Sequence, residues 1–158
     1  MSMAGRLGRE IQQKRPFRSV QEEFVLGLVR TAQQLSLPFE EVLRESRLSS
    51  SQYNVLRILR GAGDEGLPCG EISQRMVQRD PDLTRLLDRL EQRGLVARSR
   101  GTEDRRVVRA SITKEGLRLL AELDDPVEER LKKSLRHVSQ QDLRTLVELL
   151  DRVRNPEG

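Results

Sequence analysis

The sequence has few aromatic residues: three phenylalanines, one tyrosine and no tryptophan among 158 residues. Apolar residues make up only 35% of the chain, and leucine is the most frequent of them. The length suits one domain of ordinary size, but this composition gives it a lean core. We therefore expect that a second subunit covers part of its apolar surface.

Cysteine and histidine occur once each, which excludes an internal disulfide and a metal site built from several histidines. Cys69 follows Pro68 at the start of an expected helix. Two interpretations of Cys69 are possible: a small residue that fills a turn, or a reactive thiolate stabilised by the N-terminus of the helix. The first is favoured. His137 is interpreted as a structural or surface residue rather than a sensor of pH or ligand.

The usual sequence features of enzymes are also missing. A Ser/His/Asp triad would have to use the single His137, and no metal-ligand spacing is visible. The Gly61-Ala62-Gly63 stretch is too short and too badly placed to cradle a phosphate. We therefore expect no enzyme, no bound metal and no cofactor.

No stretch approaches the roughly 20 uncharged apolar residues that a membrane-spanning helix requires. Residues 1–18 lack the apolar run of a signal peptide, so the chain is expected to be cytoplasmic and to have no membrane partner. The same residues are basic and weakly patterned, which predicts a mobile arm.

Arginine is the residue present in excess. The 29 basic residues outnumber the 25 acidic ones, and 25 of the 29 are arginine, which makes flat contacts with phosphates and guanine edges. A GC-rich genome would also enrich arginine, so position has to decide. Residues 98–109 carry five arginines against two acidic residues, whereas residues 121–129 carry five acidic residues and no basic one. This separation favours a face for a polyanion.

Apolar residues at helical spacing predict a mainly α-helical chain. The first such stripe covers residues 21–35, and Pro38 is expected to end its helix. A short helix is then expected over residues 39–45. Ser49 or Ser50 is suited to cap the next helix, which carries Tyr53, Leu56 and Leu59 and stops at residues 61–63. A loop over residues 64–68 and a short helix over residues 71–77 follow.

Asp80-Pro81 is a strong helix start, since aspartate caps free N–H groups and proline at the first position loses no hydrogen bond. The helix is expected over residues 81–93, with Gly94 in the left-handed position after it. Its leucines form one buried stripe: Leu83, Leu86, Leu87 and Leu90. The opposite face then carries Thr84, Arg85, Asp88 and Arg89.

Residues 95–100 and 106–112 can form two strands around residues 101–104, which predicts a β-hairpin with a polar tip. In an extended strand Asp104 and Arg106 point to one side, so the carboxylate can hold the guanidinium in one pose. An oriented arginine suits a narrow minor groove, and Arg105 points the other way, toward phosphate. The alternative is a surface ion pair worth about 0–1 kcal/mol.

Two helices are expected after the hairpin. Thr113 caps the first, which Pro126 is expected to kink or break. Residues 139–142 resemble a capping box with aspartate in place of glutamate or glutamine, and they begin the last helix. The apolar stripe of that helix favours a dimer interface over an intrachain core.

The order helix, helix, capped helix and charged hairpin over residues 50–112 is that of a winged helix-turn-helix. In such a unit the second helix of the pair enters the major groove, where Thr84 and Arg85 in its first turn would meet bases. The alternative is a solvated charged face on a packed helix, which the adjoining hairpin makes less favourable.

The runs "LSSSQYNVLRIL", "PDLTRLLDRLEQRGLVARSR" and "EDRRVVRASITKEG" resemble the MarR family of bacterial transcription regulators. The likeness extends from Phe24 to the C-terminus, and its most specific part is a wing signature formed by Asp104, Arg105, Arg106, Thr113 and Gly116. Two departures stand out. In "RASIT", Ile112 stands before the threonine where family members more commonly have leucine. In addition, the first helix lacks the cysteine that redox-sensing members carry there.

The resemblance implies a homodimer whose base is formed by the first and last helices. It also implies that a small, often aromatic or phenolic, acid binds between the dimer base and the winged unit and releases DNA. The residues expected to bind DNA are Thr84, Arg85, Arg89, Asp104, Arg105 and Arg106. The residues expected at the dimer interface are Phe24, Leu28, Leu143, Leu146, Val147 and Leu150.

The resulting prediction is a mainly α protein with a small β-hairpin: a winged helix-turn-helix between N- and C-terminal dimerisation helices. The expected parts are a mobile basic arm, N-terminal helices, the winged unit and C-terminal helices, at residues 1–18, 19–48, 49–112 and 113–158. The expected function is that of a homodimeric repressor that binds a pseudo-palindromic operator in double-stranded DNA. A small-molecule effector is expected to release it from the DNA. The alternative is a winged-helix protein-interaction module without DNA binding, which the arginines at 85, 105 and 106 argue against.

Overall fold

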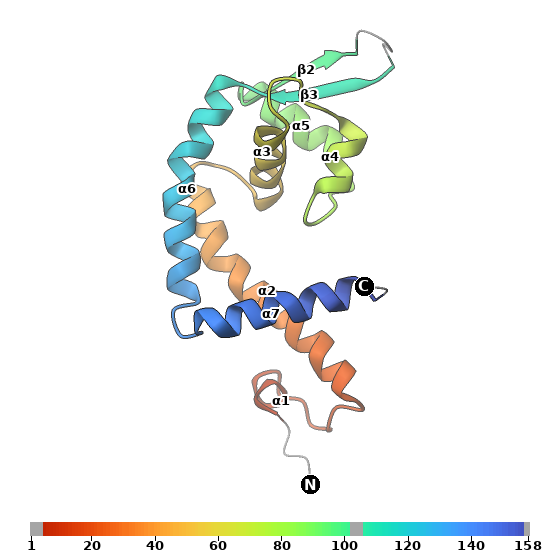
Figure 1. Ribbon diagram of the computed structural model, residues 1–158, viewed down its shortest axis with the longest axis vertical. Helices are drawn as coiled ribbons and strands as arrows, with labels where there is room; N and C mark the ends of the chain where they lie inside the picture. Colours follow the sequence, from red (N-terminus) through yellow and green to blue (C-terminus); the bar gives the residue numbers. More distant parts are fainter. Residues whose placement is uncertain (1–4, 102–105, 157–158) are drawn as a thin grey trace. The chain divides into compact units, whose positions relative to one another are not determined.

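The computed structural model describes residues 5–101 and 106–156, and it confirms a mainly helical protein with a small antiparallel sheet (Figure 1). The elements in chain order are α1 (Arg6–Glu10), α2 (Val20–Glu45), α3 (Ser50–Ala62), β1 (Leu67–Pro68), α4 (Cys69–Arg75), α5 (Leu83–Gln92), β2 (Val96–Arg100), β3 (Val108–Ile112), α6 (Lys114–Ser134) and α7 (Gln140–Arg154). Within the described residues, no helix is both long enough and apolar enough to cross a membrane.

The chain divides into two compact units, Met1–Pro38 and Phe39–Gly158, and the boundary falls inside α2. In the first unit, the Ser19 hydroxyl accepts a hydrogen bond from the Glu22 backbone N–H at 3.1 Å at the start of α2. The short helix α1 lies within the segment that the sequence predicts to be a mobile arm. Its weak apolar pattern gave no sign of a helix, and its mobility stays a prediction.

The expectation that Pro38 ends its helix is wrong, since α2 continues to Glu45 as one element. Pro126 was expected to kink or break its helix; it does not break α6, and the kink stays a prediction. A proline inside a helix removes one backbone hydrogen bond and costs about 3 kcal/mol. The turns after each proline carry buried side chains, Leu43 in α2 and Val127 in α6, whose burial favours continuing the helix.

The core of the second unit forms around α3, which contacts α4, α5, α6 and β3. Its largest fully buried side chains come from the end of α2 and from the four helices α3 to α6: Leu43, Leu56, Leu59, Ile72, Leu87, Leu90 and Leu120. The α3 helix begins with the expected cap, in which Ser49 and Gln52 exchange backbone and side-chain hydrogen bonds of 3.0 and 3.1 Å. It ends at Gly63, whose φ of 72° suits glycine.

The sheet has three strands in the order β1-β3-β2, where the sequence predicts a two-stranded hairpin. Leu67 pairs with Ala110 in a segment that was expected to be a loop. A two-residue strand has no alternation to recognise, and Pro68 is tolerated because β1 lies at the edge of the sheet. Gly66 lets this segment approach β3, since a Cβ there would lie 2.2 Å from the Ala110 carbonyl oxygen.

The helices after the sheet begin at the expected caps. Thr113 accepts from the Gly116 backbone N–H at 3.1 Å at the start of α6. Ser139 accepts from the Asp142 backbone N–H at the start of α7. The expected capping box is only half formed there, because the Asp142 carboxylate accepts from the Ser139 hydroxyl. Aspartate is one methylene shorter than the glutamate that normally reaches the backbone.

Gly116 marks a close approach of α6 to the sheet, and its replacement is expected to destabilise the protein. A Cβ there would lie 2.4 Å from the Leu95 carbonyl oxygen and 2.7 Å from Cγ1 of Ile112. Gly116→Ala is therefore expected to lower the free energy of unfolding by about 1–3 kcal/mol, measured by urea denaturation. Gly61→Ala is the control, since a Cβ there meets nothing within 4 Å. Equal stability of the two variants would contradict the close contact.

Candidate nucleic-acid interface

Helix α5 begins two residues later than the sequence predicts. Asp82, not Asp80, is its cap and accepts from the Arg85 backbone N–H at 3.4 Å. Asp80 instead accepts from the Asp82 backbone N–H at 2.9 Å, and this turn places Pro81 before the helix. Aspartate is a good N-cap at either position, so the sequence alone did not fix whether α5 begins after Asp80 or after Asp82.

The expected division of α5 into two faces is observed. Leu86, Leu87 and Leu90 are buried and Leu83 is partly buried. Thr84, Arg85 and Arg89 are exposed on the other side. The Arg85 side chain is 70% exposed, and its Nε lies 3.3 Å from Oδ2 of Asp82. Its guanidinium is therefore presented to solvent in the first turn of the helix, while the Asp82 carboxylate restrains it near the helix start.

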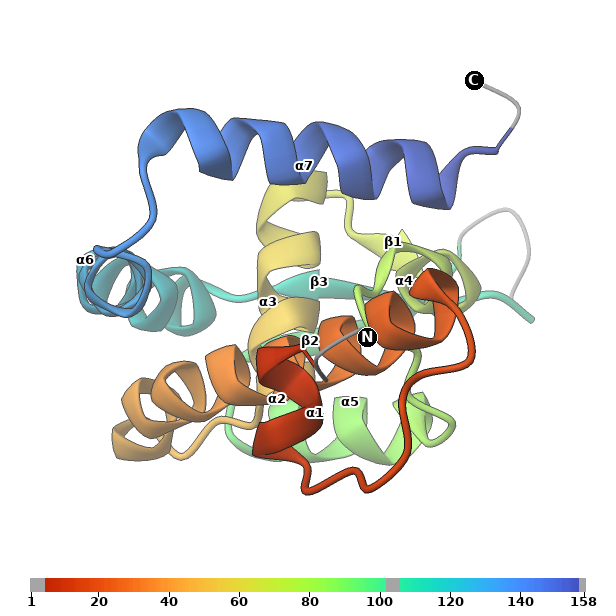
Figure 2. The same ribbon diagram turned by 90° about the horizontal axis from the view of Figure 1, so that it is seen from below.

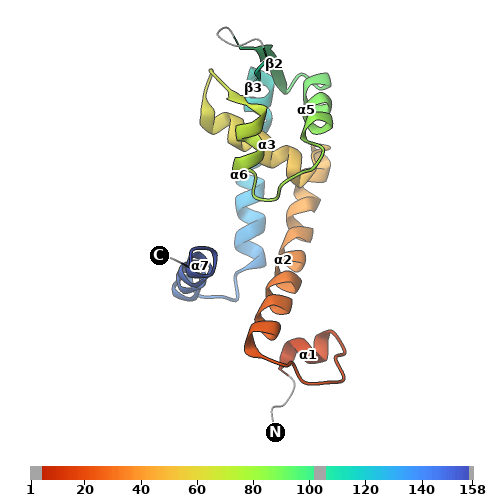
Figure 3. The same ribbon diagram turned by 90° about the vertical axis from the view of Figure 1, so that its right-hand side faces the viewer.

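The wing is formed by β2 and β3, which pair from Val96 opposite Ile112 to Arg100 opposite Val108. Arg106 is exposed just before β3. Asp104 and Arg105 lie outside the described residues, so their expected roles, including the pairing of Asp104 with Arg106, stay predictions. Figures 1 and 3 show α5 beside the hairpin, which places the two arginine-bearing elements at one end of this unit.

Two of the five arginines in residues 98–109 belong to the fold rather than to an open basic face. Arg98 donates to Asp88 and Glu91 of α5, and its side chain is only 23% exposed. Arg109 donates to the carbonyl oxygens of Glu65 and Gly66 at 3.2 and 3.0 Å. The charge count therefore overstates the basic surface of this segment.

The acidic segment at residues 121–129 is likewise not a separate region of uncompensated negative charge. Asp124 in α6 receives three charge-assisted hydrogen bonds from the Arg60 guanidinium in α3, at 2.8, 3.0 and 3.1 Å. These bonds raise the pKa of the Arg60 guanidinium and cross-link the two helices. An acidic run read along the sequence is thus partly neutralised by a cation that lies far away in the chain.

Arg93 is a structural contact that the sequence did not indicate. Its guanidinium donates to the Arg47 and Ser46 carbonyl oxygens at 2.7 and 2.9 Å, in the turn after α2. Arg47 itself has a φ of 53°, which is uncommon for a side chain of this size. The C-terminal end of α5 is thereby anchored to the turn that follows α2.

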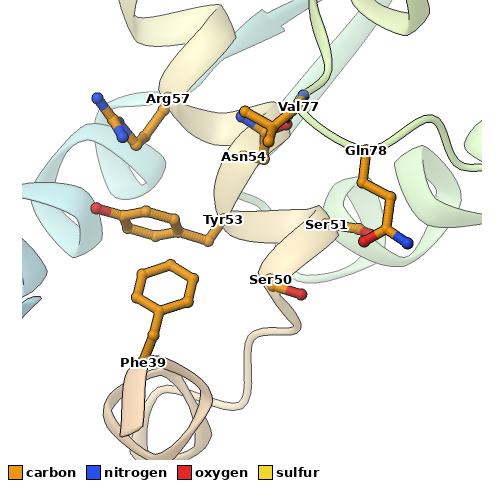
Figure 4. A pocket seen from close by; sticks show the side chains of 8 residues that line it. All are labelled: Phe39, Ser50, Ser51, Tyr53, Asn54, Arg57, Val77 and Gln78. Atoms are coloured by element: carbon orange, nitrogen blue, oxygen red, sulfur yellow. Dashed lines mark hydrogen bonds between the residues drawn. The ribbon is translucent and has the colours of Figure 1, made fainter. Parts of the chain in front are cut away.

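A small cleft of about 190 Å³ opens beside the start of α3 (Figure 4). The rings of Phe39 and Tyr53 meet edge to face with centroids 5.4 Å apart, and the Arg57 guanidinium lies 5.9 Å from the Tyr53 ring centre. Asn54 accepts from the Val77 backbone N–H at 2.9 Å, which joins the cleft to the segment before α5. Burial raises the pKa of the Tyr53 hydroxyl, so it stays protonated at neutral pH.

The lone cysteine and histidine lie as the sequence favoured. Cys69 is half-buried at the start of α4, and burial raises the pKa of its thiol, which opposes thiolate formation. His137 is exposed in the turn between α6 and α7. Among the described residues, no group of three or more histidine, cysteine or acidic side chains could hold a metal ion.

The expected dimer residues are not absorbed by the core. None of the described residues of α7 is buried, so its apolar stripe does not close the intrachain core that was the alternative. Leu146 and Val147 are 50% and 58% exposed, while Leu143 and Leu150 are half-buried. Figures 1 and 2 show α7 leaving α6 at a steep angle. Phe24 and Leu28 of α2 are also exposed.

A central α3 beneath a capped α5 and a β2–β3 wing defines a winged helix-turn-helix protein. Residues 48–108 match the model of the MarR family. The regulator FarR of Neisseria gonorrhoeae is 30% identical over 115 residues, which cover 73% of this chain and 77% of FarR. The chain belongs to the MarR family of transcriptional regulators.

Solved structures agree with this assignment. A MarR transcription factor from Planctomyces limnophilus is 40% identical, with a TM-score of 0.68, over 85% of this chain and 98% of that chain. NadR, solved in complex with 4-hydroxyphenylacetate, is 27% identical, with a TM-score of 0.70, over 88% of this chain and 97% of NadR.

Proposed function

We propose that the protein is a homodimeric repressor that binds a pseudo-palindromic operator, one half-site per subunit. The observation that carries this proposal is the exposed arginine face of α5 beside the wing. In this arrangement Thr84, Arg85 and Arg89 face the major groove, while the wing, with Arg106 supported by Asp104 and with Arg105, follows the backbone into the adjacent minor groove. The helices outside residues 49–112 supply the dimer base.

The experiment that tests this function measures DNA binding by fluorescence anisotropy over a range of salt concentrations. The probe is a labelled duplex of the intergenic DNA beside the gene, and a scrambled duplex of equal length is the control. A repressor of this kind binds the first duplex more tightly, and its affinity falls steeply with salt because counterions leave the phosphates. A protein-interaction module would show a flat salt dependence with either duplex.

We further propose that the cleft beside α3 receives the effector, a small aromatic acid. The cleft is smaller than the roughly 300 Å³ and more that drug-sized ligands occupy, so it suits a single ring. Phe39 and Tyr53 offer ring contacts, and the exposed Arg57 guanidinium offers a partner for a carboxylate. The complex of NadR with 4-hydroxyphenylacetate supports this ligand class in a related protein.

Arg57→Ala is expected to weaken the response to the acid by about tenfold or more while leaving DNA affinity without ligand unchanged. The reason is the loss of charge-assisted hydrogen bonds to the carboxylate. The measurement is displacement of labelled DNA by 4-hydroxyphenylacetate, with the neutral 4-hydroxyphenylacetamide as a matched ligand. Arg118→Ala is the charge control, since Arg118 pairs only within α6 with Glu115 and Glu122 in the described contacts. An unchanged response of Arg57→Ala would remove this residue from the site.

A further inference from the structure

The Arg98 side chain links the wing strand β2 to the helix α5. Its Nε lies 3.0 Å from Oε2 of Glu91, and its Nη2 lies 2.6 Å from the same oxygen and 2.5 Å from Oδ1 of Asp88. The other Glu91 oxygen accepts from the Arg98 backbone N–H at 3.1 Å. Glu91 therefore holds both the side chain and the backbone of the same strand residue.

The position of Arg98 in β2 shows what this contact adds to the packing. Val96 is the last buried residue of the strand, and Ala97, Ser99 and Arg100 are all exposed. Arg98 lies two residues further toward the wing tip, about 7 Å along an extended strand. Opposite it, β3 is held by β1 and by the contacts of Arg109. Arg98 thus fixes the edge of the wing that the core does not reach.

The acidic partners of Arg98 also need an explanation. Asp88 and Glu91 lie on the helix that carries Arg85 and Arg89, and their side chains are 45% and 39% exposed. Two carboxylates beside a phosphate backbone would weaken binding if net charge alone mattered. Their hydrogen bonds raise the pKa of Arg98, lower that of Glu91 and direct both negative charges toward the strand. The carboxylates therefore have a use that does not involve DNA.

We propose that Arg98 is a positioning residue that holds the wing against the recognition helix α5. The two elements then contact the duplex in a fixed orientation relative to each other. This inference rests on the proposed DNA-binding function. In this proposal Arg98 makes no DNA contact of its own, since its Nε and Nη2 donors are used by Glu91 and Asp88. The lock aligns the wing arginine Arg106 with the minor groove once α5 occupies the major groove.

The decisive variant removes the negative charges and keeps the side-chain shapes: Asp88→Asn with Glu91→Gln. If the two carboxylates act only through charge, their loss strengthens binding to the anionic duplex. If they position the wing through Arg98, binding to the same labelled duplex weakens by about tenfold. Lys132→Ala is the opposite-sign charge control at the far end of α6, where Lys132 pairs with Glu128, and it is expected to bind within about twofold of the wild type.

A double-mutant cycle with Arg106→Ala separates positioning from general stability. In the wild-type background Arg106→Ala is expected to weaken binding about tenfold, but at most about threefold once Asp88→Asn and Glu91→Gln have released the wing. Arg98→Ala is expected to reproduce this loss of coupling, and thermal unfolding checks that each variant is folded. Unchanged or tighter binding of the charge variant, or equal losses for Arg106→Ala in both backgrounds, would overturn the proposal. Failure of the wild type to bind any duplex would instead overturn the proposed function.

Discussion

Replacing Leu146 and Val147 of α7 by aspartate is expected to dissociate the homodimer and to weaken operator binding by at least about a hundredfold. The two residues are 50% and 58% exposed, and none of the described residues of α7 contributes to the core. Exposed apolar side chains along one helix are typical of a subunit interface. Binding two half-sites at once raises the affinity about 10²–10⁴-fold over binding one, and a monomer loses this increase in affinity.

The measurement pairs light scattering after size-exclusion chromatography with anisotropy on the operator duplex. Gln141→Asp with Thr145→Asp is the matched control, because it adds the same two negative charges at exposed positions of the same helix outside the apolar stripe. Far-UV circular dichroism is expected to be unchanged in both variants, since the core does not use these side chains. A variant that stays dimeric, or a wild type that is monomeric at micromolar concentration, would contradict the proposed interface.

The features of the fold that the sequence predicted correctly depend on local chemistry. The cap of α3, expected at Ser49 or Ser50 and found at Ser49, the left-handed Gly94 and the Thr113 cap are each set within a few residues. The leucine stripe of α5 is likewise a property of one helix. The failed prediction at Pro38 and the unbroken helix at Pro126 have the opposite origin, because burial of later turns outweighed the local cost of proline. The strand β1 exists only because β3 pairs with it.

The candidate site shows the same limit. Exposure of Arg85 and Arg89 follows from helix periodicity, so the sequence could predict it. The structural roles of Arg93 and Arg109 depend on carbonyl oxygens 43 to 47 residues away, which no local pattern reveals. An arginine-rich stretch therefore contains both potential DNA contacts and structural cations. Only their partners in the folded chain tell the two apart.

Arg85→Ala is expected to weaken operator binding by about tenfold to a hundredfold and to relax discrimination at one or two base pairs. Arg85 lies in the first turn of α5, where recognition helices meet base edges, and its side chain is 70% exposed. A bidentate contact from arginine to guanine is worth about 1–3 kcal/mol of discrimination. Asp82 restrains the guanidinium without covering it, so little reorganisation is needed to bind.

The measurement is anisotropy on the operator duplex and on duplexes with single base-pair changes. Arg106→Ala is the comparison, because a minor-groove arginine is expected to weaken binding with less change in major-groove preference. Arg118→Ala controls for the loss of one charge on an exposed helix face. A uniform loss over all duplexes would make Arg85 a phosphate contact, because such contacts carry no sequence information. Unchanged affinity would remove it from the interface altogether.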